Sequence, residues 1–496
     1  MKILMVSSEA VPFAKTGGLA DMVSALSINL AKLGHDVKIV IPRYYSIDRG
    51  GLSQLPGALG VPVGGGEEWG GVYTAHMPGT SKKNPVQVYF IDHEIYFGRD
   101  GIYGTIFESD FLDNPRRFTF FCRAVFQLCR KLGWYPDILH AHDWPSALVP
   151  VYLKYAERAY GNAGGFEEAS SVLTVHNLGY QGIYNKDNFN YTGLGWDVFY
   201  NAGFEDWNML NLLKAGLYSA DKLNTVSPNY AEETKLQAHG FRLDGVLRYR
   251  SGDYSGILNG IDTAVWNPRN DALIPKRYSV DNMEGKAVAK KALQRYFGLP
   301  EESGVPVIGM ITRLTDQKGV SELFGPNYGS VWSMCNDMKL QMVLIGTGES
   351  WCEHEVYSLS SRLPNFKTHI GYNEELSHLI EAGSDFFLMP SRYEPCGLNQ
   401  MYSLVYGTLP IVRKTGGLAD TVVNYNEKKG IGTGFMFEDI TPQAIYNTVG
   451  WAVWEWYNHP EHISSMRRNA MQQDFSWEKS ARKYMSLYEE AIVKNS

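Results

Sequence analysis

The chain has 496 residues, which is too long for one ordinary core and predicts two or three domains. Its composition is that of a globular protein, and a formal net charge of -7 argues against binding to nucleic acid or an acidic membrane. The five cysteines form no CxxC pair, so neither a zinc knuckle nor a disulfide framework is indicated.

Strand-like and helix-like patterns alternate through the first half of the chain. A short apolar strand is expected over residues 3–7, and the helix after it repeats apolar residues at helical spacing until Gly34. The opening apolar run is too brief for a signal peptide and no later run reaches membrane-spanning length, so a cytoplasmic protein without a membrane partner is expected. Further strands are predicted at residues 36–42, 86–91, 137–140, 172–176 and 222–226, with helices at 115–132 and 144–155. This alternation predicts crossover connections in a doubly wound parallel sheet.

The second half repeats the same order of elements. Strands are predicted at residues 307–312, 342–345, 368–370, 386–389 and 409–412, with helices at 374–382 and 397–406. The Gly, Asp and Pro residues of NGIDTAVWNP, at 259–268, mark the boundary between the halves. We therefore expect an N-terminal Rossmann-like lobe over residues 1–258, a C-terminal Rossmann-like lobe over 259–475 and a terminal helix over 476–496. The glycine-rich residues 50–71 are expected to form a surface loop.

The heptapeptide KTGGLAD occurs twice, at residues 15–21 and 414–420. Each copy follows a short apolar run and precedes a helix-like pattern. A strand, a glycine turn and a helix N-terminus together suit an anion, because free backbone N–H groups and the helix dipole converge there. The repeat therefore indicates two similar α/β halves, and the alternative is a coincidence of two ordinary strand-to-helix turns.

Polar residues that follow the predicted strands are the candidate site, since open α/β sheets bind ligands at the carboxyl edge. Lys15, Arg313 and Lys318 stand beside glycine turns or strand ends in an acidic chain, as a diphosphate site requires. Taken singly, Arg313 and Lys318 are equally compatible with solvated loop cations. His176 is likewise compatible with a structural imidazole, and Glu394 with a surface ion pair.

Two other motifs point to different chemistry. His140 and His142 have a metal-ligand spacing, but no further ligand set follows at a recognisable distance. The sequence GTG at 346–348 lacks the third glycine of a dinucleotide fingerprint. No Asp-x-Asp pair occurs anywhere in the chain, so we expect cations to stabilise the diphosphate with no metal and no cofactor.

Taken together, these segments resemble the bacterial glycogen synthases and plant starch synthases from end to end. The motifs that carry the resemblance are SSEAVPFAKTGGLADMV near the start, HAHDW at 140–144, TVHNLGYQG at 174–182, TVSPNYAEE at 225–233, ILNGID at 257–262, TRLTDQKG at 312–319 and SRYEPCGLNQMYSLVYGTLPIVRKTGGLADTV at 391–422. KTGGL near the N-terminus together with EPCGL is specific to this family. The resemblance implies the GT-B-type glycosyltransferase architecture, with two Rossmann-like lobes facing a central cleft and the last helix returning to the N-terminal lobe.

The resemblance also implies roles for individual residues. Lys15, Arg313 and Lys318 would bind the donor's phosphates. Glu394 would grip glucose hydroxyls, His176 would contact the transferred sugar, and Asp143 would lie beside the reacting centre. The further donor contacts implied are Gly18, Asp21 as a supporting carboxylate, Asn259, Tyr372 against the nucleotide base, and the backbone of Cys396, Gly397, Leu398 and Asn399 as a diphosphate cradle. The Asn399 side chain is treated as replaceable, and Tyr402 stands where many related lobes carry a second glutamate.

By the same likeness, the chain is expected to transfer glucose from ADP-glucose to the non-reducing end of an α-1,4-glucan, such as glycogen or a maltooligosaccharide, with retention of configuration. Lobe closure would bring Lys15 to Arg313 and Lys318 and exclude water. UDP-glucose is the competing donor. The family's contacts to the nucleotide base are few and are made largely by backbone atoms, so the sequence separates the two donors poorly. A non-catalytic α-glucan-binding protein would be expected to have lost one of four charged residues, yet all four are present: Lys15, Arg313, Lys318 and Glu394. A nicotinamide-dependent oxidoreductase is disfavoured by the missing fingerprint, and a metal hydrolase built on His140 and His142 lacks a ligand set.

Overall fold

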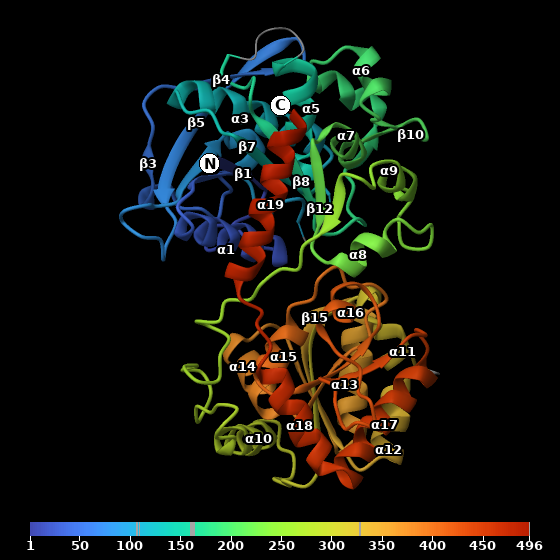
Figure 1. Cartoon of the computed structure of the whole chain (residues 1–496). Coiled ribbons are helices and arrows are strands. Elements are labelled where there is room, and N and C mark those ends of the chain that lie inside the picture. The colour runs from blue at the N-terminus through green and yellow to red at the C-terminus, as the bar shows by residue number, and fades with distance from the viewer. Residues whose placement is uncertain (106–107, 109, 159–163, 327–328, 496) are drawn as a thin grey trace. The chain divides into compact units, whose positions relative to one another are not determined.

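The computed structural model describes residues 1–105, 108, 110–158, 164–326 and 329–495. Contacts divide the chain into two compact units: unit 1 comprises Met1–Gly260 and Trp477–Ser496, and unit 2 comprises Ile261–Ser476. Each unit is built on a sheet with helices around it (Figure 1). The division falls two residues after the sequence-based boundary, and Ser496, the end of the predicted terminal segment, lies outside the described residues.

The main sheet of unit 1 has the first strand of the chain near its centre. The strand order is β13–β12–β8–β7–β1–β2–β6–β5–β3, with β4 paired to β5. Pairing is parallel from β13 to β6, with Met5 of β1 opposite Ile39 of β2 and His140 of β7, and β5 is antiparallel to β6. The bounds are β1 Lys2–Val6, β2 Asp36–Pro42, β3 Ser53–Gln54, β4 Leu59–Val63, β5 Gly66–His76, β6 Gln87–Asp92, β7 Ile138–His142, β8 Ser170–Val175, β12 Lys222–Thr225 and β13 Tyr254–Gly256. Since the chain leaves β1 first toward β2 and later returns to the other side at β7, the topological switch point lies between β1 and β7.

The glycine-rich residues 50–71 are not a loop, and that prediction is wrong. They contain β3, β4 and the first part of β5, and the apolar residues of β4 are buried on one face of a hairpin. Gly64 closes the hairpin turn with a φ of 59°, a left-handed conformation that costs glycine little. Glycine and proline interrupt the apolar alternation of β4, so the strand pattern is weak in the sequence.

Helices and one small sheet complete unit 1. The helices are α1 Gly18–Lys32, α2 Glu94–Phe97, α3 Asn114–Leu132, α4 Asp143–Ser146, α5 Leu148–Tyr152, α6 Trp196–Asn201, α7 Leu212–Ser219, α8 Pro228–Glu233, α9 Asp244–Tyr249 and α19 Trp477–Asn495; the small antiparallel sheet consists of β9 Ile183–Asn185, β10 Glu205–Asp206 and β11 Met209–Asn211. The terminal helix α19 packs against α1 and the sheet strands β8 and β12 (Figure 1). Its Tyr484 hydroxyl accepts a hydrogen bond from Nδ2 of Asn224 at 3.0 Å, so the predicted return of the last helix is confirmed.

The sheet of unit 2 is parallel throughout, in the order β16–β15–β14–β17–β18–β19. Its strands are β14 Val307–Leu314, β15 Gln341–Gly348, β16 Phe366–Ile370, β17 Phe386–Met389, β18 Leu409–Arg413 and β19 Phe435–Phe437; its helices are α10 Glu284–Tyr296, α11 Val320–Phe324, α12 Ser330–Asp337, α13 Ser350–Arg362, α14 Glu374–Gly383, α15 Asn399–Val405, α16 Gly416–Thr421, α17 Pro442–Asn458 and α18 Pro460–Met471. The strands carry continuous buried apolar runs, as a sheet covered on both faces requires. The chain leaves β14 toward β15 and later returns at β17, which places the switch point of this unit between β14 and β17.

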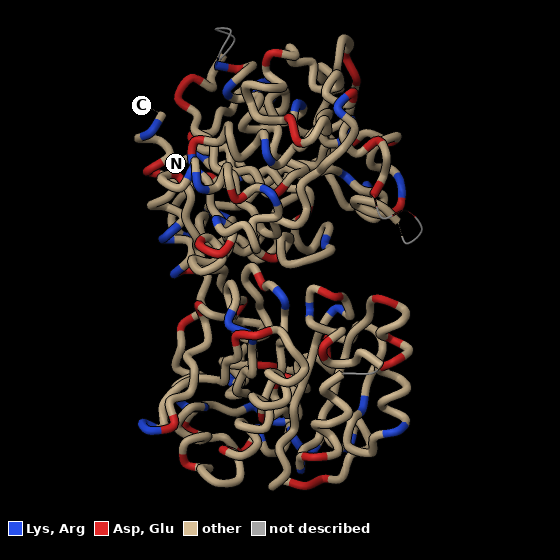
Figure 2. The backbone as a smooth tube through the Cα atoms, turned by 90° about the vertical axis from the view of Figure 1, so that its right-hand side faces the viewer, with Lys and Arg blue, Asp and Glu red and all other residues tan. Residues whose placement is uncertain are grey.

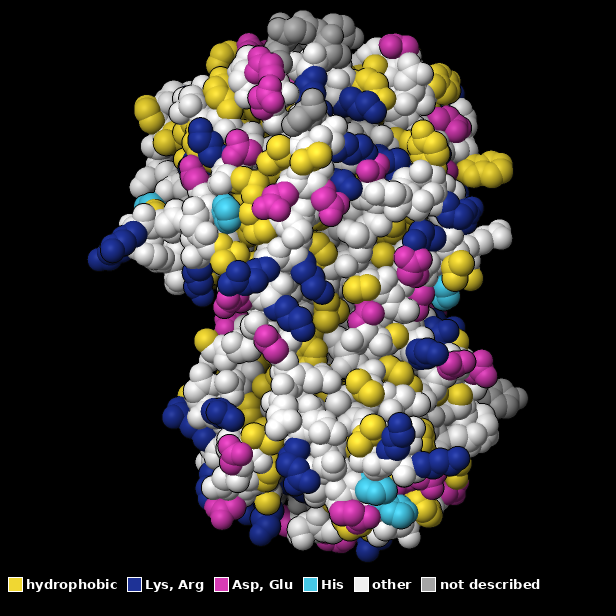
Figure 3. All heavy atoms as spheres, viewed as in Figure 1, with side chains coloured by type: hydrophobic (Ala, Val, Ile, Leu, Met, Phe, Trp, Pro, Cys, Tyr) yellow, Lys and Arg dark blue, Asp and Glu magenta, His cyan; other side chains and the backbone are white. Residues whose placement is uncertain are grey.

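Charged residues of both signs are interspersed along the backbone of both units (Figure 2), and their side chains are interspersed over the face drawn in Figure 3. Among the described residues, every helix is too short or too polar to span a membrane.

Candidate active site

Lys15 lies in the loop that joins β1 to α1, at the switch point of unit 1. Its ammonium group pairs with Oδ1 of Asp21, in the first turn of α1, at 2.8 Å. The Lys15 side chain is 50% exposed, and an ion pair this exposed contributes little to stability. Lys15 can therefore leave Asp21 for a more highly charged anion at small cost.

Glu9 holds this loop in place, and the sequence reasoning did not single it out. Its buried carboxylate accepts hydrogen bonds from both the backbone N–H and the hydroxyl of Thr16, the latter at 2.7 Å. The Tyr103 hydroxyl also donates to Glu9, at 2.6 Å. Glu9 lies three residues after the end of β1, so the rule that selects polar residues after strands would have found it.

Asp143 and His176 meet at the ends of β7 and β8. Asp143 begins α4 with a φ of 56°, a left-handed conformation that is uncommon outside glycine and is tolerated by Asp and Asn. Its Oδ1 accepts a hydrogen bond from the backbone N–H of His176 at 2.7 Å. The loop after β8 is thereby tied to the start of α4, and two predicted site residues lie together.

The charge states of this group follow from its burial. Burial raises the pKa of Asp143 to about 7; the N–H groups of His176 and Asn177 oppose that rise, and the charge of Glu9 adds to it. Burial also lowers the pKa of His176 to about 3 and that of His142 well below 6.5. Near neutral pH the two imidazoles are uncharged, and Asp143 is only partly ionised.

The Asp143→Asn variant is expected to change how stability depends on pH. In the folded protein the carboxyl has a pKa of about 7 instead of 3.8. The protonated carboxyl therefore adds to the free energy of unfolding, and this contribution is fully present below about pH 4 and is lost as pH rises to about 7. The difference is worth at most about 4 kcal/mol, since one pKa unit is about 1.4 kcal/mol. Thermal unfolding between pH 4.5 and 8 should show the wild type losing stability relative to D143N as pH rises. Parallel curves would show that the carboxyl is not perturbed.

His140 is a structural residue. It is fully buried, and its ring nitrogens bond to the hydroxyls of Tyr488, at 2.8 Å, and Thr174, at 2.6 Å. Both nitrogens are therefore occupied, which removes the basis for a metal site built on His140 and His142.

In unit 2, Lys318 and Glu394 form the central pair at the switch point. Lys318 follows β14 and Glu394 follows β17, and the ammonium nitrogen lies 2.5 Å from Oε2 of the carboxylate. The same oxygen accepts a hydrogen bond from the Ser391 hydroxyl at 2.8 Å. Glu394 is 6% exposed, so it is not a member of a surface ion pair. Both side chains line a pocket of about 90 Å³ whose wall includes the ends of β14 and β17 and residues 397–399.

The second copy of the heptapeptide supports the turn that carries Glu394. A Cβ on Gly416 would lie 1.9 Å from the Glu394 carbonyl oxygen, and one on Gly417 would lie 1.9 Å from that of Cys396. The N–H of Gly417 also donates to the Glu394 carbonyl at 3.0 Å. In the first copy, by contrast, a Cβ on Gly17 would meet nothing within 4 Å. The glycines of the second copy therefore serve close backbone packing, whereas Gly17 in the first copy faces open space.

Comparisons with known proteins agree with this arrangement. A profile of the starch synthase catalytic domain matches residues 2–249, and one of glycosyl transferases group 1 matches residues 296–473. A glycogen synthase from Treponema denticola is 60% identical over 496 residues, which cover 100% of this chain and 99% of that protein. The chain belongs to the glycogen and starch synthase family.

Other members of the family and one more distant protein extend this result. Glycogen synthase 1 from Geobacter metallireducens is 47% identical over 498 residues, and the alignment covers 100% of this chain and 97% of that protein. The catalytic domain of starch synthase IV from Arabidopsis thaliana, solved with ADP and acarbose, has a TM-score of 0.87 at 30% identity and covers 99% of both chains. A sucrose-phosphate synthase from Thermosynechococcus elongatus, with a TM-score of 0.59 at 17% identity and coverage of 99% and 98%, shares the fold. The predicted family and GT-B fold class are confirmed, and the chain is a glycosyltransferase.

The remaining residues that the family resemblance singles out lie in several places. Tyr372 follows β16 and is 80% exposed, so its ring face is open to a flat partner. Asn399 starts α15, and its side chain donates to the Ile311 carbonyl at 2.8 Å, which ties the 397–399 turn to β14. Asn259 is buried in unit 1, and its Oδ1 has no hydrogen-bond partner among the described residues. Arg313, near the end of β14, is exposed and forms no ion pair with any described side chain.

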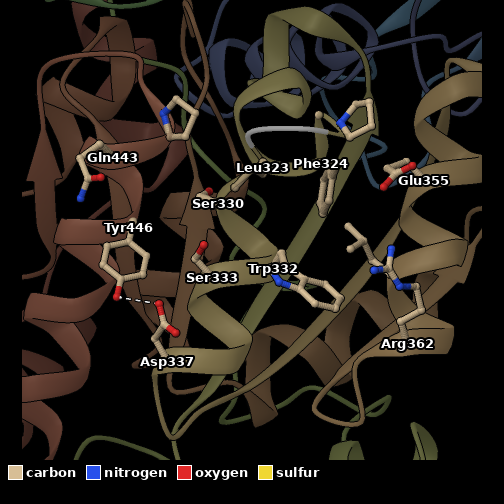
Figure 4. A pocket seen from close by; sticks show the side chains of 15 residues that line it. Leu323, Phe324, Ser330, Trp332, Ser333, Asp337, Glu355, Arg362, Gln443 and Tyr446 are labelled. Atoms are coloured by element: carbon tan, nitrogen blue, oxygen red, sulfur yellow. Dashed lines mark hydrogen bonds between the residues drawn. The ribbon is translucent and has the colours of Figure 1, made fainter.

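A larger pocket of about 680 Å³ lies elsewhere in unit 2, among α11, α12, α13 and the start of α17 (Figure 4). Its wall includes Trp332, Arg362 and Tyr446, whose hydroxyl donates to Asp337 at 3.1 Å. None of the predicted site residues lines it, so size alone does not identify the family's site.

Proposed function

We propose that the chain is a glycogen synthase that transfers glucose from ADP-glucose to the non-reducing end of an α-1,4-glucan with retention of configuration. The observation that carries this proposal is the pair of Lys318 and the buried Glu394 beside a pocket at the switch point of unit 2. A cation and a carboxylate placed there suit a substrate with a diphosphate at one end and sugar hydroxyls at the other. The solved relative with ADP bound supports adenine as the base.

The cations act on the leaving group. Lys15, Arg313 and Lys318 bind the donor's phosphates, and fixed positive charge lowers the barrier as negative charge develops on the departing oxygen. Lys15 exchanges its exposed contact with Asp21 for the diphosphate. The backbone of residues 396–399 cradles the same diphosphate, and Gly18 at the start of α1 allows close approach to it.

The remaining groups orient the sugar and the base. Glu394 accepts hydrogen bonds from glucose hydroxyls, and its position is fixed by Lys318 and Ser391. The neutral His176 imidazole contacts the transferred glucose, with Asp143 beside it. Tyr372 stacks on the base, and Asn259 supplies a further donor contact through its unpartnered oxygen.

The reaction follows a same-face route. The bond between the anomeric carbon and the diphosphate oxygen breaks, the acceptor hydroxyl oxygen bonds to the same face of that carbon, and the acceptor's proton passes to the departing phosphate oxygen. A covalent route would need a carboxylate nucleophile, and Asp143 is the residue to consider. Its pKa of about 7 leaves a part of it ionised at neutral pH, and the covalent route ranks second to the same-face route.

We expect the purified chain, given glycogen as primer, to release ADP from ADP-glucose in buffer with excess EDTA. UDP-glucose is expected to support slower turnover at equal concentration. Faster turnover with UDP-glucose would reassign the donor, and loss of turnover in EDTA that added Mg²⁺ restores would refute metal-free stabilisation. A chain that binds glycogen but turns over neither donor would instead be a glucan-binding protein.

A further inference from the structure

Two histidines and a glutamate converge where α17 ends and α18 begins, on a part of unit 2 that the proposed reaction does not use. One donor atom from each of Glu455, His459 and His462 lies within 4.8 Å of the donor atoms of the other two. Glu455 is in the last turn of α17, His459 joins the two helices, and His462 is in the first turn of α18. Figure 3 shows neighbouring histidine side chains beside an acidic one on the surface of unit 2.

Glu455 is a buried carboxylate with one unused oxygen. Its exposed fraction is 0%, and Oε1 has no hydrogen-bond partner among the described residues. The other oxygen, Oε2, accepts a hydrogen bond from the Tyr425 hydroxyl at 2.9 Å. No lysine or arginine in the described ranges forms an ion pair with Glu455, so its charge has no cation partner within unit 2. A buried carboxylate in this state favours a cation.

Tyr425 also prepares His462 to act as a ligand. Its hydroxyl lies 2.6 Å from Nδ1 of His462. The single hydroxyl proton of Tyr425 is donated to Glu455, so the hydroxyl oxygen accepts a hydrogen bond from the ring of His462. The ring proton of His462 therefore sits on Nδ1, and Nε2 keeps its lone pair. Histidines that ligate metal ions commonly donate their second ring N–H to an oxygen in this way. One phenol thus orients both an imidazole and a carboxylate.

The surroundings keep the two imidazoles accessible and in place. The His459 and His462 rings are stacked with centroids 5.0 Å apart, and both side chains are about one-third exposed or less. A Cβ on Gly430 would lie 2.6 Å from Nε2 of His462, so only glycine leaves room for the ring there. The exposed Glu461 carboxylate lies 3.5 Å from Nδ1 of His459 and 4.0 Å from Nε2 of His462, within reach of a fourth ligand position.

We propose that Glu455, His459 and His462 form a site for a divalent transition-metal cation of the zinc class. Two imidazoles and one carboxylate are a ligand set that Zn²⁺ accepts, with water or Glu461 in the fourth position. The site joins the end of α17, the start of α18 and, through Tyr425, the segment between α16 and β19. Its role is to stabilise this corner of unit 2, separately from the reaction at the switch point.

Metal binding to the whole purified chain tests the proposal directly. After treatment with a chelator and gel filtration, the protein is titrated with Zn²⁺, and separately with Co²⁺ as a spectroscopic probe. We expect one equivalent bound, a visible d–d absorption of the Co²⁺ form with nitrogen and oxygen ligands, and a higher unfolding temperature with Zn²⁺. The double variant His459→Asn and His462→Asn should lose at least about 100-fold in affinity, and Tyr425→Phe about 10- to 100-fold.

The control is His354→Asn, an exposed histidine on α13 that should leave binding unchanged. Circular dichroism of each variant shows whether it is folded. The proposal is overturned if the wild type binds no stoichiometric Zn²⁺ or Co²⁺, or if a folded H459N/H462N variant binds as tightly as the wild type. In either case the cluster is a hydrogen-bonded network without an ion.

Discussion

Replacing Lys15 with alanine is expected to lower kcat by about 100- to 1000-fold, the loss typical of one preorganised electrostatic contact to a developing anion. Its ammonium group has only an exposed ion pair with Asp21 in the absence of donor, so little stability should be lost with it. The KM for glycogen should change far less than kcat, because the residue acts on the leaving diphosphate. Steady-state ADP release and a thermal unfolding curve measure these effects.

Lys414→Ala is the matched control, since it alters the same position of the identical heptapeptide. The Lys414 ammonium pairs with the exposed Glu438 at 2.9 Å, and the proposal gives it no contact with the donor. Turnover within about twofold of the wild type is expected. Equal losses in the two variants would show that the copies are equivalent and that the role assigned to Lys15 is wrong.

The Lys318–Glu394 pair predicts a second large effect, on both stability and turnover. Lys318→Met leaves the carboxylate of Glu394 buried without its cation, and removing one partner of a buried pair costs about 3–5 kcal/mol. Glu394→Gln should cost less, because the neutral amide needs no counter-charge. The double variant should have a higher free energy of unfolding than K318M alone. The turnover of all three variants should be at least about 100-fold slower than that of the wild type.

Urea unfolding followed by tryptophan fluorescence measures the stability part of this prediction. Lys276→Met is a suitable control, because its partner Glu284 is exposed and no measurable change is expected. If the losses of K318M and E394Q were simply additive in the double variant, the two side chains would not be energetically coupled. Full turnover in E394Q would remove Glu394 from the donor site.

The edge of the sheet on which each predicted site residue lies could be read from the sequence, because strand alternation fixes which edge these residues share. Lys15, Asp143 and His176 follow strands of one sheet, and Lys318 and Glu394 follow strands of the other. The order of strands then places Lys15 and Asp143 at one switch point, with His176 one strand farther along, and Lys318 and Glu394 at the other. No knowledge of side-chain contacts is needed for that step.

The contacts that set charge and rigidity could not be predicted, since they join residues far apart in the sequence. Tyr103 reaches Glu9 across 94 positions, and the burial that raises the pKa of Asp143 depends on the packed structure. The two heptapeptides are identical in sequence, yet Gly416 packs against another turn, whereas a Cβ on its counterpart Gly17 would meet nothing within 4 Å. Their different roles therefore arise from their neighbours in the folded chain.

Retaining transfer of glucose to a glucan leaves a signature in the anomeric configuration of the product. ADP-glucose labelled with ¹³C at the anomeric carbon is incubated with the protein and a maltooligosaccharide, and the reaction is followed by NMR from the first minutes. We predict that the label appears in an α-1,4-linked terminal glucose, with ADP released in equal amount. A β-linked product would rule out retention, and label found only as free glucose would rule out transfer to the glucan.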